Sequence, residues 1–282
     1  MPDAGQHSRL PRNFHKTFKP ERQYIHAMLR FAASGREGDS QEIAAATGIP
    51  TGASSGKVPA ILDYCRGMGL IQLAGADRSA IKKPDLTPFG RIVLLEDPFL
   101  KLGVSQWIAH LNLCGPLNGA DVWYQTFFAG SQSLGMTFER EKLESHLGLV
   151  YGVEKSGLIG PVIGTYEDDA SFKTCGALSE TSGTVRRKMA PVTEEMALGY
   201  GAWVLQLMGT HFPKLRQIPI TDLDGVAGWR TIPGWDISSL QRALEMMVRK
   251  GAVEVDRHME PWLIAPATDV EQAWKRIYDD LL

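Results

Sequence analysis

The sequence has few cysteines, and none of them are paired in a motif. Its 282 residues include three cysteines, Cys65, Cys114 and Cys175, which are widely separated and form no CxxC pair. A disulfide framework is typically built from a denser and even set of cysteines, so none is expected. An odd and sparse set suits a reducing compartment, and the sequence therefore predicts a cytoplasmic protein.

Long hydrophobic runs and an excess of charge are also missing. No apolar run reaches the roughly 18 residues that a membrane span needs, and the first residues lack the apolar core of a signal peptide. No membrane association is therefore expected. The chain has 30 Lys and Arg against 32 Asp and Glu, a net charge of −2, which argues against a uniformly basic surface. Any contact with DNA must come from a local group of cations.

Several catalytic and nucleotide-binding motifs are absent too. The chain has no Ser nucleophile elbow, no HExxH and no GxGxxG. The span from Gly52 to Gly56 is one residue too short for a P-loop, and Val58 stands where Ser or Thr would bind magnesium. No nucleotide cofactor is therefore expected. The PD-(D/E)xK nuclease pattern fails as well, because Pro98 stands where the lysine after Glu96 should be.

The clearest positive pattern lies between residues 21 and 75. Apolar residues at helical spacing predict a first helix, and a second helix follows with Ser40 as its N-cap and Gly48 as its stop. A third helix ends at Gly69, and residues 70–73 form a predicted strand. Three helices with a trailing strand are typical of a winged helix-turn-helix.

A similar layout recurs near the C-terminus, where a helix stops at Gly251 before two short strands. The predicted fold class is mainly α with small β wings (α+β), with two winged-helix-like modules joined by a helical middle. In that middle, Thr137 is expected to cap a helix over residues 138–147. The predicted domains are a basic N-terminal arm (1–20), a winged helix-turn-helix-like domain (21–95), a helical middle region with a Gly/Ser-rich loop (96–192) and a C-terminal helical, winged-helix-like domain (193–282).

Basic residues in the first module favour contact with a DNA backbone. Two readings of the N-terminal cations stay open, an arm that touches phosphates through counterion release and a solvated tail. The third helix opens with small hydroxyls and one lysine, which suit a phosphate, but offers few base-contacting side chains. Winged helices can equally serve as protein-binding modules. The predicted DNA-contacting residues are Arg12, His15, Lys16, Lys19, Arg22, Ser54, Ser55, Lys57, Arg66, Lys82, Lys83, Arg186 and Arg187.

Candidates for chemistry lie downstream of this module. Metal-assisted phosphodiester cleavage needs carboxylates that converge on one or two cations. The predicted catalytic residues are Glu96, Asp97 and His110, with Mg²⁺ or Mn²⁺ as the expected cofactor, although a helix cap and turn explain Glu96 and Asp97 equally well. The acidic stretch 166–169 has the same two readings, a divalent-cation site or a helix cap. The sequence assigns no metal ligands.

Several short sequence motifs, taken in order along the chain, resemble those of a known family. They are Phe14-His15-Lys16-Thr17-Phe18, Gly56-Lys57-Val58 running to Tyr64, Leu86-Thr87-Pro88-Phe89-Gly90, Leu95-Glu96-Asp97-Pro98 with Trp107 and His110, and Val122-Trp123-Tyr124 running to Phe128. Together they resemble a family of bacterial proteins of unknown function encoded beside DNA phosphorothioation genes, the family that includes SspB of the Ssp defence system. The resemblance is good over residues 12–150 and looser beyond.

The resemblance implies a component of a DNA modification system. Its expected partners are double-stranded DNA, a cysteine desulfurase, an ATPase and an adenylating sulfur-transfer enzyme, which together replace a non-bridging phosphate oxygen with sulfur. The expected role is to bind DNA and to introduce or support single-strand nicks, and the alternative is a non-catalytic DNA-binding regulator or scaffold. The resemblance assigns no catalytic residues, and the sequence leaves a homodimer open.

Overall fold

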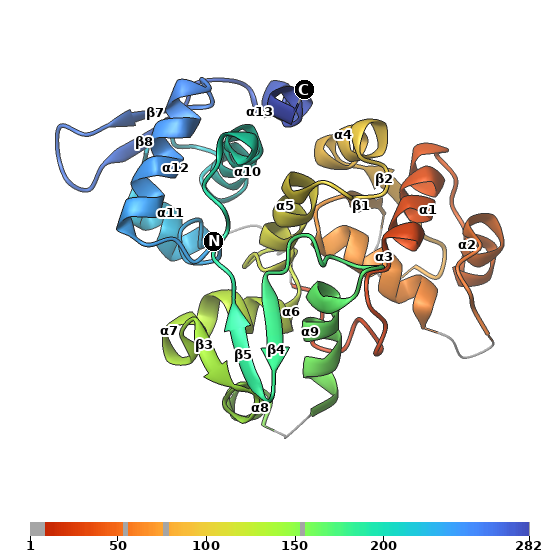
Figure 1. The fold of residues 1–282 in the computed structure, drawn as a ribbon. Coiled ribbons are helices and arrows are strands. Elements are labelled where there is room, and N and C mark those ends of the chain that lie inside the picture. The colour runs from red at the N-terminus through yellow and green to blue at the C-terminus, as the bar shows by residue number, and fades with distance from the viewer. Residues whose placement is uncertain (1–8, 53–55, 76–78, 153–155, 282) are drawn as a thin grey trace. The chain divides into compact units, whose positions relative to one another are not determined.

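The chain folds mainly into helices, with small antiparallel sheets between them, which agrees with the predicted α+β class. The computed structural model describes residues 9–52, 56–75, 79–152 and 156–281. The chain divides into two compact units, Met1–Lys188 (unit 1) and Met189–Leu282 (unit 2) (Figure 1). In the part that the structure describes, no helix is long and apolar enough to cross a membrane.

Unit 1 begins with three helices and a two-stranded hairpin. The hairpin is antiparallel, with Ile71 opposite Leu86. The helices bury their apolar faces against one another, so that Ile25, Leu29 and Ile61 are completely shielded from solvent. The three helices and the trailing strand were all predicted from the sequence, and their bounds are α1 (Arg22–Ala33), α2 (Ser40–Thr47), α3 (Lys57–Gly67), β1 (Ile71–Ala74) and β2 (Lys83–Leu86).

The start of α2 differs by one residue from the prediction. Asp39, not Ser40, is the N-cap, and its carboxylate accepts hydrogen bonds from the backbone N–H groups of Gln41 and Glu42. The backbone N–H of Asp39 in turn donates to the side-chain carboxylate of Glu42 at 2.8 Å, which completes a capping box. The helix stops at Gly48 as predicted, in the left-handed conformation that glycine adopts easily.

A short fourth helix, α4 (Pro88–Glu96), lies close to the backbone that precedes the first strand. Thr87 caps α4 by accepting from the N–H of Gly90, and its hydroxyl donates to the carbonyl of Gly69 at 2.6 Å. A Cβ atom on Gly90 would lie 1.9 Å from the carbonyl oxygen of Leu70. Only glycine fits there, because any side chain would force α4 away from the backbone that precedes β1.

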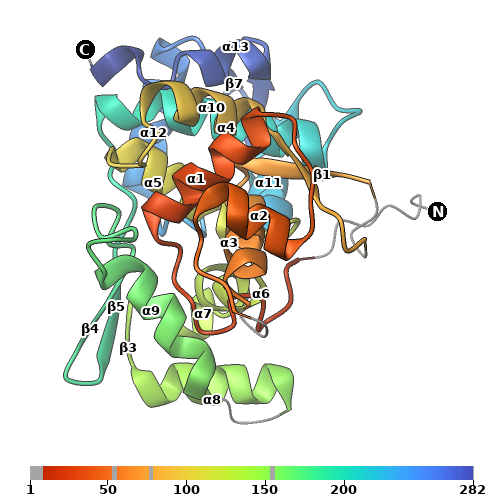
Figure 2. The same ribbon diagram turned by 90° about the vertical axis from the view of Figure 1, so that its right-hand side faces the viewer.

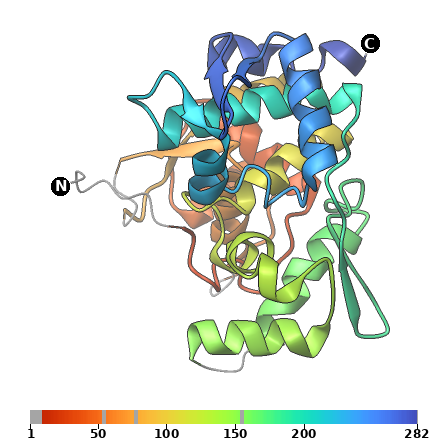
Figure 3. The same cartoon turned by 90° about the vertical axis from the view of Figure 1, so that its left-hand side faces the viewer.

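The rest of unit 1 combines further helices with a three-stranded sheet of order β3-β5-β4. Figures 2 and 3 show this sheet from two sides, with α8 and α9 next to it in Figure 2. The elements are α5 (Gly103–Leu113), α6 (Asp121–Tyr124), the π-helix η1 (Gln125–Ala129), α7 (Ser131–Leu134), β3 (Thr137–Glu139), α8 (Arg140–Tyr151), the 3-10 helix η2 (Ser156–Leu158), α9 (Ile159–Glu167), β4 (Leu178–Thr181) and β5 (Thr184–Arg187).

Two sequence predictions in this region are wrong. Thr137 does not cap a helix, because Thr137–Glu139 forms strand β3, with Phe138 opposite Val185 and both side chains buried. The helix begins only at Arg140. The predicted Gly/Ser-rich loop of the middle region is also more regular than expected, since residues 159–187 hold α9 and the β4–β5 hairpin.

Unit 2 is built around one long buried helix, α10 (Glu194–His211). The predicted helix near residue 237 is capped by Asp236, whose carboxylate accepts from the N–H of Ser239 at 2.7 Å. Its stop at Gly251 and the two following strands were also predicted. The sheet order is β6-β8-β7, and the elements are β6 (Ile218–Pro219), α11 (Ile220–Ala227), α12 (Ile237–Arg249), β7 (Val253–Asp256), β8 (Leu263–Pro266), α13 (Val270–Lys275) and the 3-10 helix η3 (Asp279–Leu281).

Candidate nucleic-acid interface

Residues 10–18 of the N-terminal segment run antiparallel along α3. Leu10 packs against Gly67 at the end of the helix, and the ring of Phe14 meets the ring of Tyr64 edge-on at 4.8 Å between centroids. The hydroxyl of Tyr64 donates to the carbonyl of Phe18 at 3.0 Å. This segment covers one face of α3, and no side chain of the helix is fully exposed. The face of α3 that this segment covers is therefore not free to enter a DNA groove.

A strained turn places Lys16 at the start of α3. Lys16 and Thr17 both have positive φ angles, 52° and 85°, and such a conformation is costly for a β-branched residue. The turn is held by the N–H of Thr17, which donates to Nδ1 of His15 at 3.1 Å. The aliphatic part of Lys16 lies against Gly56, where a Cβ atom would come within 2.8 Å of it. Its ammonium group remains exposed at the surface.

His15 itself points into the core of unit 1 rather than to the surface. Its side chain is 2% exposed, and burial lowers its pKa to about 4. Its ring packs against Phe14 and Trp123. The imidazole is therefore neutral at neutral pH and carries no charge that could attract a phosphate.

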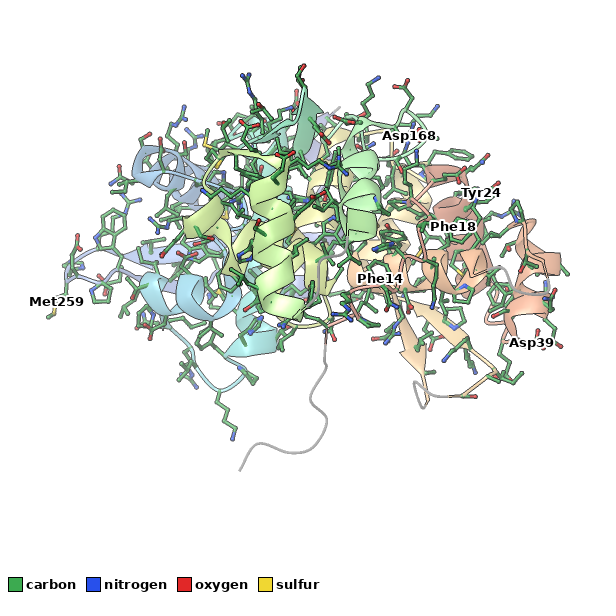
Figure 4. The ribbon with its side chains drawn as sticks, turned by 90° about the horizontal axis from the view of Figure 1, so that it is seen from below. Phe14, Phe18, Tyr24, Asp39, Asp168 and Met259 are labelled. Atoms are coloured by element: carbon green, nitrogen blue, oxygen red, sulfur yellow. The ribbon has the colours of Figure 1, made fainter. Side chains whose placement is uncertain are left out.

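Many of the predicted DNA-contacting cations already have partners within unit 1. Lys57 lies 2.7 Å from the carboxylate of Glu21 and above the ring of Tyr24, and its side chain is 14% exposed. Lys19 forms an ion pair with Asp168. Figure 4 shows Phe18, Tyr24 and Asp168 on the same side of unit 1, where these pairs form.

Three further predicted cations also have interaction partners within unit 1. Arg22 donates to the carbonyl oxygen of Asp169 at 2.6 Å. The guanidinium of Arg12 lies above the ring of Tyr151, and Arg66 pairs with Asp63 one helical turn away, at 3.0 Å. A phosphate that bound any of these groups would have to compete with an existing acceptor.

The remaining predicted cations differ in exposure. Arg187 is buried, and its guanidinium donates to the carbonyl of Phe127 at 3.1 Å and lies above that ring. Lys82 is half-buried, and its backbone pairs with that of Gly38. Lys83, Arg186 and Lys16 are exposed, and no carboxylate of the described residues pairs with any of the three. Ser54 and Ser55 lie outside the described residues.

His110 belongs to a buried polar cluster in the middle of unit 1. The indole N–H of Trp123 donates to the hydroxyl oxygen of Tyr166 at 2.9 Å, and the same hydroxyl is hydrogen-bonded to Nδ1 of His110 at 2.6 Å. Burial lowers the pKa of His110 to about 3, and it raises the pKa of Tyr166 well above its usual value. Both groups are neutral at neutral pH and shielded from solvent.

The two candidate acids sit in different environments. Asp97 is 5% exposed, and its carboxylate accepts three hydrogen bonds, from the N–H of Lys101 at 2.8 Å, the N–H of Leu102 at 2.9 Å and the hydroxyl of Ser105 at 2.6 Å. These bonds fix the turn that precedes α5. Glu96 is exposed at the last position of α4. Asp97 thus has a structural task whether or not it has a catalytic one.

The acidic stretch of residues 167–169 is also distributed among separate partners. Glu167 accepts from the backbone N–H of Glu180 at 2.7 Å, Asp168 pairs with Lys19, and Asp169 pairs with Lys173 at 2.8 Å. In the described ranges, no three His, Cys, Asp or Glu side chains gather closely enough to hold a metal ion. These residues therefore do not fit a preformed Mg²⁺ or Mn²⁺ site.

Sequence reasoning missed the contacts that pin the N-terminal segment to the body of unit 1. Arg9 forms an ion pair with Asp121 at 2.8 Å, and its guanidinium stacks on the ring of Tyr124 at 3.8 Å. The hydroxyl of Tyr151 donates to the same carboxylate at 2.7 Å. The one local signal was the Phe14–Phe18 phrase, whose two aromatic residues flank a histidine.

Comparison with known proteins identifies two solved structures with the same fold. One is described as a magnesium ion-bound SspB crystal structure, with a TM-score of 0.68 and 15% sequence identity over 95% of this chain and 87% of that one. The other, an SspB crystal structure, has a TM-score of 0.64 and 16% identity over 98% and 89% of the two chains. No protein-family model and no curated protein sequence matches the chain. The predicted resemblance to SspB is therefore confirmed at the level of the fold.

Proposed function

We propose that the protein is a DNA-binding component of a bacterial DNA phosphorothioate modification system, which introduces or supports the single-strand nicks needed for sulfur incorporation. The observation that carries this proposal is the fold shared with SspB over 95% of the chain. The order of elements agrees with it, since α1–α3 followed by β1 and β2 have the succession of a winged helix-turn-helix. The succession from α10 to β8 is compatible with a second such module.

DNA contact in this proposal is made with the phosphate backbone rather than with bases. The N-terminal segment covers α3, and the exposed cations Lys16, Lys83 and Arg186 come from a loop and two strands. Lysine and arginine side chains at such positions gain binding energy by releasing counterions from the duplex, whatever its sequence. The protein would then bind double-stranded DNA with little sequence preference of its own.

Nicking is the part of the proposal that an assay tests most simply. Supercoiled plasmid incubated with the full-length protein and Mg²⁺ or Mn²⁺ is expected to accumulate as open circles, and EDTA is expected to stop this. Because the described residues gather no metal-binding cluster, we assign no step of the cleavage to a bound cation. Plasmid that stays supercoiled with both metals would rule out intrinsic nicking but not DNA binding.

A second candidate function is that of a non-catalytic DNA-binding scaffold or regulator. Two observations favour it, because Asp97 already accepts three hydrogen bonds and His110 is buried and bonded to Tyr166. The scaffold would hold DNA for a cysteine desulfurase, an ATPase and an adenylating sulfur-transfer enzyme. Its signature in the plasmid assay is bound DNA that remains supercoiled, with Glu96→Ala indistinguishable from the wild type.

Removing the three exposed cations tests the backbone contact itself. The Lys16→Ala, Lys83→Ala and Arg186→Ala triple variant is expected to bind a labelled duplex at least about tenfold more weakly at moderate salt, since each lost phosphate contact weakens binding. Fluorescence anisotropy measures the affinity. The control replaces three other exposed cations, Arg91, Lys101 and Lys142, and so changes the net charge equally. Equal losses in both variants would mean that only overall charge matters.

A further inference from the structure

The sheet of unit 2 carries a hollow that is lined mainly by residues of β7, β8 and the loop between them. Its volume is about 470 Å³, and the lining includes Glu254 and Asp256 from β7 and Leu263 and Ala265 from β8. In the register of the two strands, Glu254 lies opposite Ala265 and Asp256 lies opposite Leu263. Each carboxylate thus stands across from an apolar side chain. We call this surface the β7 hollow.

The charge of the β7 hollow is negative. Glu254 is exposed, and no basic side chain of the described residues pairs with it. Hydrogen bonds from the backbone N–H of His258 and from its ring hold the pKa of Asp256 below its usual value, so this carboxylate is ionised at neutral pH. The arginine of the lining, Arg257, stacks on the ring of Trp262 and lies 4.0 Å from Glu245.

The rest of unit 2 reinforces this negative field. Residues 189–282 contain 9 Lys and Arg against 13 Asp and Glu, a net charge of −4, whereas residues 1–188 contain 21 against 19, a net charge of +2. Nucleic acid is therefore disfavoured at the β7 hollow, and a cationic ligand is attracted to it. Unit 2 therefore has a net negative charge, and unit 1 has a net positive charge.

The geometry of the sheet suits an extended ligand. The order β6-β8-β7 leaves β7 at the edge of the sheet, where an added strand can pair with the backbone. The hairpin loop projects from the helices of unit 2, with the side chain of Met259 at its tip 79% exposed (Figure 4). Side chains of an extended segment that pairs with β7 alternate in direction. Cations on one side of that segment would reach Glu254 and Asp256, and apolar side chains on its other side would lie next to the half-buried Val255.

We propose that the β7 hollow binds an extended segment of a protein partner in which lysine or arginine alternates with apolar residues. The cations of that segment pair with Glu254 and Asp256, and its backbone lies along the edge of β7. Unit 2 is then a protein-docking module, and this assignment does not depend on whether unit 1 binds DNA.

A synthetic peptide tests the site on the full-length protein. The probe is a fluorescein-labelled peptide of about ten residues that alternates lysine with valine, and its partner probe has glutamate in place of each lysine. Fluorescence anisotropy is expected to show saturable binding of the lysine peptide only. The double variant Glu254→Lys, Asp256→Lys is expected to weaken that binding at least about tenfold, because both pairs become repulsive. The control Glu195→Lys, an exposed acid on α10, should bind as the wild type does.

Three results would overturn the proposal. The first is a wild-type protein that does not bind the lysine peptide. The second is equal binding by the wild type and the double variant, which would place the peptide elsewhere. The third is a double variant with at least a tenfold change in affinity for a labelled DNA duplex and none for the peptide, because the hollow would then face DNA.

Discussion

Acidification from pH 6 to pH 4.5 is expected to lower the free energy of unfolding by up to about 2.7 kcal/mol per pH unit through two buried histidines. Burial lowers the pKa of His15 to about 4 and that of His110 to about 3, whereas an unfolded chain titrates its histidines near 6.5. In this window each of the two groups binds up to about one proton more in the unfolded state than in the native state. Burial also lowers the pKa values of His26, His146 and His211, and these groups change the stability in the same direction. The stabilisation is fully present above the unfolded pKa and is lost as the pH falls, so acid favours unfolding.

Urea denaturation at several pH values, followed by circular dichroism, measures this slope. His110→Gln removes one of these groups and should reduce the slope by up to about 1.4 kcal/mol per pH unit, whatever it does to stability at pH 7. His258→Gln is the control, because the ring of His258 is 93% exposed. The acids with lowered pKa values, Asp168, Asp236 and Asp256, contribute only below about pH 5, and they are unchanged in His110→Gln. A free energy that stays constant from pH 7 to pH 5 would contradict the burial of both histidines.

Asp97→Ala is expected to cost about 3 kcal/mol of stability. The substitution leaves two backbone N–H groups and the hydroxyl of Ser105 without their acceptor in a buried turn, and each unsatisfied donor costs about 1–3 kcal/mol. The neighbouring change Glu96→Ala should alter stability by less than about 0.5 kcal/mol, because Glu96 is exposed at the end of α4.

This pair of variants also separates structure from catalysis. Thermal denaturation gives the stability of each variant, and the plasmid assay gives its nicking activity at a temperature where both remain folded. If Asp97 acts only through the turn before α5, any loss of activity should follow the loss of stability. A well-folded Asp97→Ala protein without the expected destabilisation would contradict the structural role derived from its three hydrogen bonds.

The elements that were predicted correctly are specified by patterns of neighbouring residues in the sequence. Helices α1, α3 and α12 show apolar residues at helical spacing, and Gly48 and Gly251 mark helix ends through their left-handed conformation. Strand β3 has no such local signal. It is three residues long, and it exists because Phe138 pairs with Val185, a residue far along the chain.

The candidate interface was less predictable because its determinants are contacts between distant residues. The sequence identified Lys19, Arg22 and Lys57 as cations, but their acceptors, such as Asp168, lie up to 149 positions away. It also indicated a phosphate contact at the start of the third helix, whereas residues 10–18 cover one face of α3. Side-chain type and periodicity indicate which interactions a residue can make. Only the fold determines which neighbour it contacts.

The salt dependence of DNA binding by the full-length protein tests the central proposal most directly. Anisotropy of a labelled duplex is measured from low to moderate NaCl, and the logarithm of the affinity is plotted against the logarithm of the salt concentration. Contact of Lys16, Lys83 and Arg186 with phosphates predicts a linear decrease with a slope of about −2.7 or steeper, since each phosphate contributes about −0.9. A protein that does not bind the duplex at low salt, or that binds it with no salt dependence, would contradict the proposed backbone contact.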